Sequence, residues 1–391
     1  MQKKQVIMQE DGSSFHTFSA RYSLSKKGFD ALFEHLKKVS EHEEFYKPKG
    51  FNADCWVCNH FSDEGLLLYL SKVPDDKGYV HYVVTCRINP RKLIDPNCSY
   101  YGIMSMDRKS LDRMEARFQK ILHKVGMDQE LNDGTLSRLD LCANLMFPLK
   151  KLPKTIMACL AKSAINGNYR LVDPRKKKIQ EPLSYPKNSL YVVPRNQKDD
   201  DYKSCFELVL YDKQAQMKEN GLLGAVEKHS KENQYGILRI ELHLGSRKIR
   251  ELAGSEKSTR EQIEYLAGRS GGLLLEYMGK VFPTGDFYSL DESKNLIDSG
   301  DFTNKMRKRM RRIVEAIAEG DTFLEALGDC EENLSGKKIT KTTKNFDRLG
   351  MNAVPLPKKA KLDYLPSVYH MMQALDGEEE RAVRFVDLKK R

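Results

Sequence analysis

Three short segments of the chain place reactive side chains between regularly alternating apolar residues. They are SRLDLCANL (137–145), FELVLYDK (206–213) and ILRIELHL (237–244). Because successive side chains of a β-strand point to opposite faces, each segment predicts a strand with one apolar and one reactive face. Strands aligned in one sheet would bring together two carboxylates, a phenol and an amine, from Asp140, Glu241, Tyr211 and Lys213. This set suits metal-assisted attack by a tyrosine on a phosphodiester.

The two carboxylates stand in apolar strands, where a charge is unfavourable unless it is paired or hydrated. A salt bridge from Arg138 or Arg239 is one explanation for Asp140 and Glu241. A divalent metal is the other, and Asn144 would add an oxygen ligand two pleats from Asp140. Mg²⁺ and Mn²⁺ prefer such oxygen ligands, and either ion would polarise a phosphate oxygen. The sequence leaves both explanations open, with Mg²⁺ or Mn²⁺ as the expected cofactor.

Tyr211 is one of 18 tyrosines, and a tyrosine in a strand usually serves packing. Lys213 distinguishes it, because an amine on the same face would lower the pKa of the phenol or protonate the leaving 3′-oxygen. Attack on phosphorus would leave a 5′-phosphotyrosyl DNA and a free 3′-hydroxyl, which can later be rejoined without ATP. The nine histidines contain no His-x-His pair, so a two-histidine metal site is not expected.

The chain carries a formal charge of +11, and part of the excess is clustered. The basic runs lie at 175–178, 305–312, 337–341, 358–361 and 389–391. Clustered positive charge favours a polyanion, most often nucleic acid, although a single run can equally be a solvated surface. Near the predicted strands, we expect phosphate contacts from Arg87, Lys92, Arg138 and Arg239.

The pattern of strands and helices predicts an α+β fold of two parts. Residues 1–250 mix strands and helices without strict βαβ alternation, which favours a largely antiparallel sheet. Within them, the polar, basic segment 170–203 is expected to form a loop or hairpin insertion near the site. Residues 251–391 are mainly helical and end in a segment expected to be peripheral.

Three helical patterns, at 303–320, 321–329 and 339–350, predict a helix–turn–helix with a basic third element. Lys341 and Lys344 would then face a DNA groove or phosphates. A plain helical bundle is the alternative.

No run approaches the roughly 20 apolar residues that a membrane span needs. The N-terminal residues lack the apolar core of a secretory signal. The eight cysteines form no evenly spaced framework, and the pair Cys55 and Cys58 lacks a second pair to complete a zinc site. A soluble, cytoplasmic protein with reduced thiols and no membrane partner is expected.

The order of the motifs resembles the replication initiators of filamentous phages, the gene II endonucleases of the phage replication protein group. That order is INPRKL followed by YYG, then LSRLDLCAN, VLYDKQAQ and ILRIELHL. The three strand motifs are also similar to those of the trans-acting initiators of Gram-positive rolling-circle plasmids. The resemblance implies a Rep-type nuclease domain that nicks and rejoins one DNA strand at a replication origin.

The resemblance also assigns roles. It implies that Tyr211 is the nicking and joining nucleophile and that Asp140 and Glu241 hold the metal, and Lys213 matches the lysine after the tyrosine. Thr85 stands where a carboxylate is expected, and Asn144 stands where plasmid initiators often have a second aspartate. The expected partners are origin DNA as duplex, hairpin or single strand, together with a host helicase and polymerase in a bacterial cytoplasm. Formation of a homodimer stays open.

Two other functions fit the same residues. A relaxase or a transposase-like strand transferase would use the same chemistry for another purpose. A non-catalytic DNA-binding regulator on a Rep-like scaffold would bind duplex DNA without forming a phosphotyrosyl intermediate.

Overall fold

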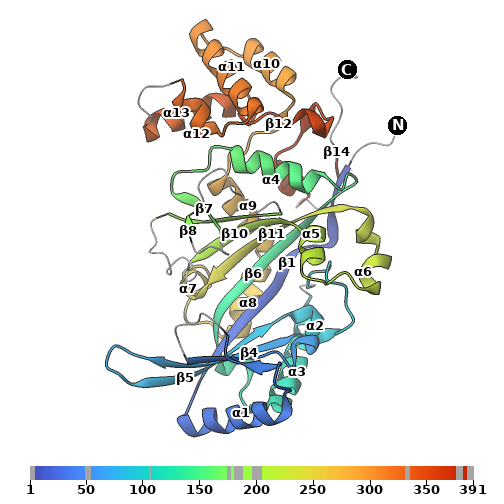
Figure 1. The fold of residues 1–391 in the computed structure, drawn as a ribbon, viewed down its shortest axis with the longest axis vertical. Helices are drawn as coiled ribbons and strands as arrows, with labels where there is room; N and C mark the ends of the chain where they lie inside the picture. Colours follow the sequence, from blue (N-terminus) through green and yellow to red (C-terminus); the bar gives the residue numbers. More distant parts are fainter. Residues whose placement is uncertain are drawn as a thin grey trace.

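The computed structural model describes residues 5–48, 54–104, 107–173, 178–179, 188–195, 205–330, 335–375 and 382–384. Its fold is α+β, as predicted, and is organised around one large sheet (Figure 1). The strands of this sheet run in the spatial order β2-β3-β4-β5-β1-β6-β11-β10-β9-β7-β8, with the short β14 beside β1. Each of these neighbouring pairs is antiparallel.

The strands have the following bounds in chain order. They are β1 (Gln5–Leu24), β2 (Phe45–Tyr46), β3 (Asp54–Cys58), β4 (Leu66–Pro74), β5 (Val80–Ile88), β6 (Thr135–Phe147), β7 (Tyr169–Asp173), β8 (Lys178–Ile179), β9 (Ser189–Pro194), β10 (Phe206–Asp212), β11 (Gly236–Gly245) and β14 (Ala382–Arg384). The described parts of segment 170–203 therefore include strands of the sheet, and the basic run at 175–178 lies mostly outside the described residues.

Alternation along the central strands gives the sheet one fully apolar face. The inward residues of β6 are completely buried, namely Leu139, Leu141, Ala143 and Leu145. On β11 the same holds for Leu238, Ile240, Leu242 and Leu244. Burial of this face against helices supplies the main core of the molecule.

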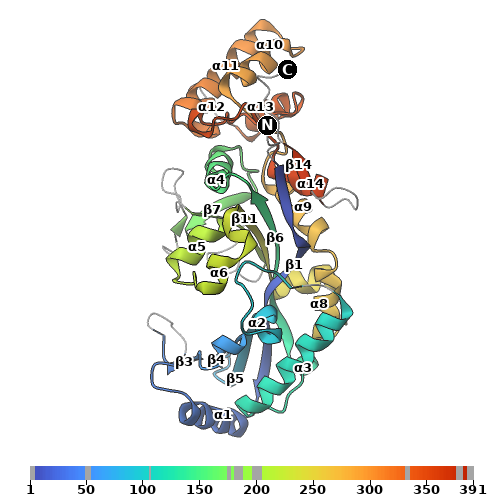
Figure 2. The ribbon, with the colours of Figure 1, turned by 90° about the vertical axis from the view of Figure 1, so that its right-hand side faces the viewer.

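Several helices contribute to that core. They are α1 (Lys26–Val39), α3 (Arg108–Val125), α4 (Leu152–Lys162), α7 (Ser246–Ala253), α8 (Thr259–Ala267) and α9 (Ser270–Val281). In Figure 2, α3, α8 and α9 lie along one side of the sheet. Because α7, α8 and α9 all contact the central strand β6, the helical part that begins near residue 250 is not wholly a separate domain.

The opposite face is covered more lightly. It carries a second, smaller apolar cluster of Tyr101, Met217 and Ile237. Met217 belongs to α5 (Lys213–Glu219), which lies with α6 (Ala225–His229) on this side of the sheet (Figure 2). The segment 98–104 covers part of the same face, because Asn144 and Arg239 donate to the Tyr101 carbonyl. The reactive residues Asp140, Tyr211, Lys213 and Glu241 are all buried.

A helical lobe extends beyond one end of the sheet (Figure 1). It contains α10 (Leu290–Ser299), α11 (Asn304–Glu319), α12 (Phe323–Gly328) and α13 (Gly336–Asp347), and the last three match the predicted helices. Lys162 at the end of α4 donates a hydrogen bond to the Ile317 carbonyl at 3.0 Å, which links this lobe to the sheet. No helix in the described ranges is long and apolar enough to cross a membrane.

The segment after residue 357 was expected to be peripheral, and most of its described part is not. The short β13 (Tyr364–Leu365) pairs with β12 (Phe287–Tyr288), and Leu365 is fully buried. The following α14 (Val368–Leu375) contributes buried Met371 and Met372 to the core. The terminal basic run at 389–391 lies outside the described residues.

Candidate active site

The strand registers place the reactive residues on one face, as their alternation predicted. Across β10 and β11, Tyr211 lies opposite Arg239, and Glu207 lies opposite His243. Across β11 and β6, His243 lies opposite Asp140, Glu241 opposite Cys142, and Arg239 opposite Asn144. Directly paired residues of neighbouring strands share a face, so these side chains form one continuous cluster.

Tyr211 and Glu241 are the closest reactive pair. The Tyr211 hydroxyl donates a hydrogen bond to Glu241 Oε1 at 2.6 Å, and both side chains are more than nine-tenths buried. Burial, reinforced by the charge of Glu241, raises the pKa of Tyr211 well above its ordinary value. Burial alone would raise the pKa of Glu241 as well, but the hydrogen bond from His243 holds it well below its usual range. The resting pair is therefore a neutral phenol beside a carboxylate.

His243 joins two carboxylates in this cluster. Its Nε2 donates to Glu241 at 2.8 Å and its Nδ1 donates to Glu207 at 3.0 Å. Burial alone would lower the pKa of His243, but Asp140 and these two hydrogen bonds raise it to about 9. Asp140 accepts a separate hydrogen bond from Arg138 Nε at 2.6 Å, which is the salt bridge that the sequence left open. The carboxylates of this face are thus balanced by neighbouring cations.

Lys213 reaches the site from a helix, where the sequence predicted the end of a strand. Strand β10 ends at Asp212, whose carboxylate accepts a hydrogen bond from the Ala215 amide and begins α5. Lys213 Nζ lies 5.8 Å from the centre of the Tyr211 ring. Burial, followed by the charge of Arg239, lowers the pKa of Lys213 well below its ordinary value. Its amine can therefore be a neutral base at the site.

Arg239, which we expected to contact phosphate, lies in the interior of the protein. Its side chain is completely buried, and its Nε donates to Asn144 Oδ1 at 2.7 Å. Its Nη2 donates to the Tyr101 carbonyl at 2.6 Å, and Asn144 Nδ2 donates to the same carbonyl at 2.8 Å. Arg239 and Asn144 together hold the segment 98–104 onto the sheet. The Asn144 oxygen proposed as a metal ligand already accepts the Arg239 hydrogen bond.

The cluster contains side chains of the types that bind a hard divalent cation. Their spatial arrangement is less suited to such an ion. Asp140 and Glu241 supply carboxylate oxygens of the kind that Mg²⁺ and Mn²⁺ bind. Over the ranges that the structure describes, no group of three or more His, Cys, Asp or Glu side chains is arranged to hold a metal ion. Arg138 and His243 already donate to one oxygen each of Asp140 and Glu241, the two carboxylates predicted to bind the metal.

The other predicted DNA contacts occupy three places. Arg87 is exposed on β5 and shares the face of the cluster, because Ser19 of β1 lies opposite both Arg87 and Arg138. The side chain of Lys92 is 13% exposed and lies over the Tyr100 ring at 4.8 Å. Lys341 and Lys344 are exposed on α13 in the helical lobe, far along the molecule from the cluster (Figure 1).

Three features of the site were missed from the sequence. Glu207, which lies opposite His243 on the face of the cluster, was not predicted to have a role. His16 occupies a break in the β1–β6 register between Phe15 and Thr17, and burial with nearby Arg239 lowers its pKa to about 3. No local sequence pattern indicates that segment 98–104 covers the sheet, because its hydrogen-bond partners lie more than 40 residues away in the chain.

The cysteines are not paired in the structure. All eight are free, and six of them are buried. Cys142 lies within the cluster, where burial raises the pKa of its thiol to about 12 and keeps it protonated.

Comparison of the chain with protein-family models, curated protein sequences and solved structures gave no match.

Proposed function

We propose that this protein is a rolling-circle DNA replication initiator, a metal-dependent endonuclease that nicks and rejoins one strand at an origin. The observation that carries the proposal is the 2.6 Å hydrogen bond from the Tyr211 hydroxyl to Glu241 on a sheet face that also holds Asp140. A phenol next to a buried carboxylate and a buried amine has the arrangement that is typical of an activated nucleophile. The net charge of +11 supplies the preference for a polyanionic substrate.

The chemistry follows from the protonation states at the site. Lys213, as a neutral amine, accepts the proton of the Tyr211 hydroxyl as the phenolic oxygen attacks phosphorus. A phosphorus–oxygen bond forms to Tyr211, the bond to the 3′-oxygen breaks, and the same proton passes to that oxygen. The products are a 5′-phosphotyrosyl DNA and a free 3′-hydroxyl, and the reverse reaction rejoins the strand.

Asp140 and Glu241 would hold Mg²⁺ or Mn²⁺, which would polarise a non-bridging phosphate oxygen. Exposed Arg87 would bind the backbone of the incoming strand on the same sheet face, and Lys341 and Lys344 would bind duplex DNA. In this function the protein acts in a bacterial cytoplasm and hands the free 3′-end to a host helicase and polymerase. A relaxase or a transposase-like strand transferase would use the same site.

A non-catalytic DNA-binding protein is the second candidate, and the salt bridge between Asp140 and Arg138 favours it. In that case the polar cluster serves stability, and Tyr211 is a buried hydrogen-bond donor. The two candidates differ in whether a covalent protein–DNA adduct forms.

The test uses supercoiled plasmids that carry overlapping fragments of the DNA around the encoding gene. The wild-type protein is expected to nick one fragment in the presence of Mg²⁺ or Mn²⁺, and chelation by EDTA should stop nicking. Tyr211→Phe should lose nicking by at least about 10³-fold, because only the nucleophilic oxygen is removed. Retention of wild-type nicking by Tyr211→Phe would refute the mechanism, and full activity in EDTA would refute the metal assignment.

A further inference from the structure

Part of the sheet keeps an exposed face next to the reactive cluster. Two neighbouring rows of directly paired residues cross β4, β5 and β1 there. The first row is Tyr69, Thr85 and Arg21, and the second is Leu67, Arg87 and Ser19. Because paired residues of neighbouring strands share a face, these six side chains form one surface. We call it the arginine–tyrosine surface.

The reverse face of the same strands is closed. Its central residues, Ala20, Leu68 and Cys86, are completely buried. Helix α3 packs on that face (Figure 2), where its Phe118 ring contacts the Phe18 ring of β1 edge to face at a separation of 6.5 Å. On the arginine–tyrosine surface, by contrast, both arginines are exposed and the tyrosine is partly exposed. This surface is therefore accessible to a ligand.

The charge of the surface favours an anion. Arg21 lies opposite Thr85, which stands two residues before Arg87 on β5, so the two arginines are diagonal neighbours. Such neighbours are about 7 to 8 Å apart, and both can therefore contact one extended ligand. Neither arginine forms an ion pair with a carboxylate in the part of the chain that the structure describes. Arginine is well suited to bidentate contact with a phosphate group.

Tyr69 adds an aromatic ring to these charges. It also lies opposite Thr85, so it is a second diagonal neighbour of Arg87, which stands between the ring and Arg21. Proteins that bind single-stranded nucleic acid combine a basic track with aromatic side chains on which the bases stack. The bases of a duplex are already stacked on one another. The combination of ring and cations therefore favours a single strand over a duplex.

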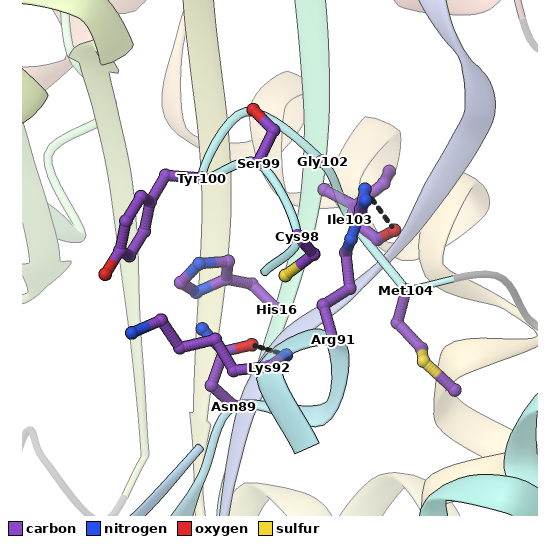
Figure 3. Close-up of a pocket in the computed structure, with 10 residues that line it drawn as sticks. All are labelled: His16, Asn89, Arg91, Lys92, Cys98, Ser99, Tyr100, Gly102, Ile103 and Met104. Atoms are coloured by element: carbon purple, nitrogen blue, oxygen red, sulfur yellow. Dashed lines mark hydrogen bonds between the residues drawn. The ribbon is translucent and has the colours of Figure 1, made fainter. Parts of the chain in front are cut away.

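The surface adjoins the reactive cluster. Ser19, in the second row, lies opposite Arg138 of β6, and Arg138 donates a hydrogen bond to Asp140 at 2.6 Å. Nearby, segment 98–104 arches over His16 (Figure 3), so the sheet face is covered on that side. A strand bound to the arginine–tyrosine surface would therefore run next to Asp140.

We propose that the arginine–tyrosine surface binds single-stranded DNA, with phosphates on Arg21 and Arg87 and a base stacked on Tyr69. Recognition of a single strand rests on the arrangement of these three side chains. That the strand is DNA, and that it is the strand to be cleaved, rests on the proposed function. Binding at this surface would limit which phosphodiesters can reach Tyr211.

The first experiment tests the arginines in full-length Tyr211→Phe protein, so that cleavage does not interfere. Fluorescence anisotropy measures affinity for a single strand of roughly 12 nucleotides and for a duplex of the same sequence. Arg21→Ala and Arg87→Ala should each weaken single-strand binding about fivefold, as expected for one lost phosphate contact, and should change duplex binding less than about twofold. Arg113→Ala removes an exposed arginine from α3 and should bind both as the parent protein does.

The second experiment tests the aromatic ring in the same background. Tyr69→Leu should weaken single-strand binding about tenfold, whereas Tyr69→Phe keeps the ring and should leave it unchanged. In addition, a single strand that carries 5-iodouracil is irradiated with the parent protein, and the cross-linked peptides are identified by mass spectrometry. We expect the peptide that contains Tyr69 among them. Circular dichroism verifies that every variant is folded.

Single-strand affinity equal to that of the parent protein in both arginine variants would overturn the proposal. Equal losses in Tyr69→Leu and Tyr69→Phe, or equal losses of single-strand and duplex binding in the arginine variants, would also overturn it. Tighter binding of RNA than of DNA with the same sequence would assign the surface to another nucleic acid. All of these outcomes are separate from the nicking test, since Tyr211→Phe protein can bind a strand that it does not cleave.

Discussion

At the scale of single residues, Arg239 connects the sheet to the segment that covers the reactive cluster. Its guanidinium contacts Asn144 and the Tyr101 carbonyl, and its charge stabilises the carboxylate of Glu241. A buried arginine is unfavourable by itself, so its stability depends on these partners. Removal of the side chain leaves those partners buried and unsatisfied, which costs more than the loss of one contact.

We therefore expect Arg239→Ala to lower the free energy of unfolding by about 3 kcal/mol. Arg87→Ala is the matched control, because Arg87 is exposed on the same sheet face, and its loss should cost less than about 0.5 kcal/mol. Urea denaturation followed by circular dichroism measures both values. Equal effects of the two substitutions would contradict a structural role for Arg239.

His16 makes the stability of the folded protein depend on pH. Its pKa is about 3 in the folded protein, mainly because of burial, and about 6.5 in an unfolded chain. Below about pH 6.5 the unfolded chain therefore binds a proton that the folded protein does not, so stability falls as the pH falls.

Because one proton is involved, the contribution is at most about 1.4 kcal/mol for each pH unit below about 6.5, and the partial exposure of His16 makes it smaller. The variant His16→Gln should lose less stability than the wild type between about pH 6.5 and about pH 5. Unfolding free energies measured across this range give the comparison. Parallel curves for the two proteins would show that His16 does not titrate in this way.

At the scale of elements, α13 presents part of the exposed positive charge of the helical lobe, and α11 presents another part. Lys341 and Lys344 lie on its exposed side, whereas Thr342, Asn345 and Phe346 are buried. The helix is held by the edge-to-face contact of Phe346 with Phe323 of α12, at a ring separation of 6.5 Å. This arrangement is consistent with contact to duplex DNA through α13, which remains a prediction.

Each lysine that contacts a phosphate contributes about 0.9 to the slope of log affinity against log salt. The double variant Lys341→Ala, Lys344→Ala should therefore bind duplex DNA more weakly and lower this slope by up to about 2. Lys26→Ala, Lys27→Ala removes two exposed lysines from α1 at the opposite end of the molecule and should leave the slope unchanged (Figure 1). Fluorescence anisotropy at several salt concentrations tests both. Identical slopes in the two variants would exclude α13 as the DNA contact.

The strands of the sheet and the helices that pack against it could be predicted, because the sequence patterns that indicate them are local. Alternation in 137–145 and 237–244 predicted β6 and β11 and the faces of Asp140 and Glu241. Lys213 was placed in a strand, whereas Asp212 favours a helix start because its carboxylate can accept the amide hydrogen bond of Ala215. That signal was present in the sequence and was overlooked.

At the scale of the whole molecule, the features that the sequence did not predict depend on distant contacts. Nothing in segment 98–104 indicates that it covers the sheet, because its hydrogen bonds come from residues 144 and 239. The division near residue 250 was also drawn from local helix patterns. Contacts of α7, α8 and α9 with β6 extend the sheet's core beyond that point.

The central claim is that Tyr211 forms a covalent bond to DNA on this sheet face. The direct measurement is a denaturing gel of protein incubated with the nicked DNA fragment, followed by mass spectrometry of the peptide that carries the nucleotide. The account predicts a 5′-phosphotyrosyl adduct on Tyr211 and no adduct in Tyr211→Phe, which should stay folded because it loses about 1 kcal/mol with the hydrogen bond to Glu241. An adduct on another residue, or nicking without any adduct, would contradict it.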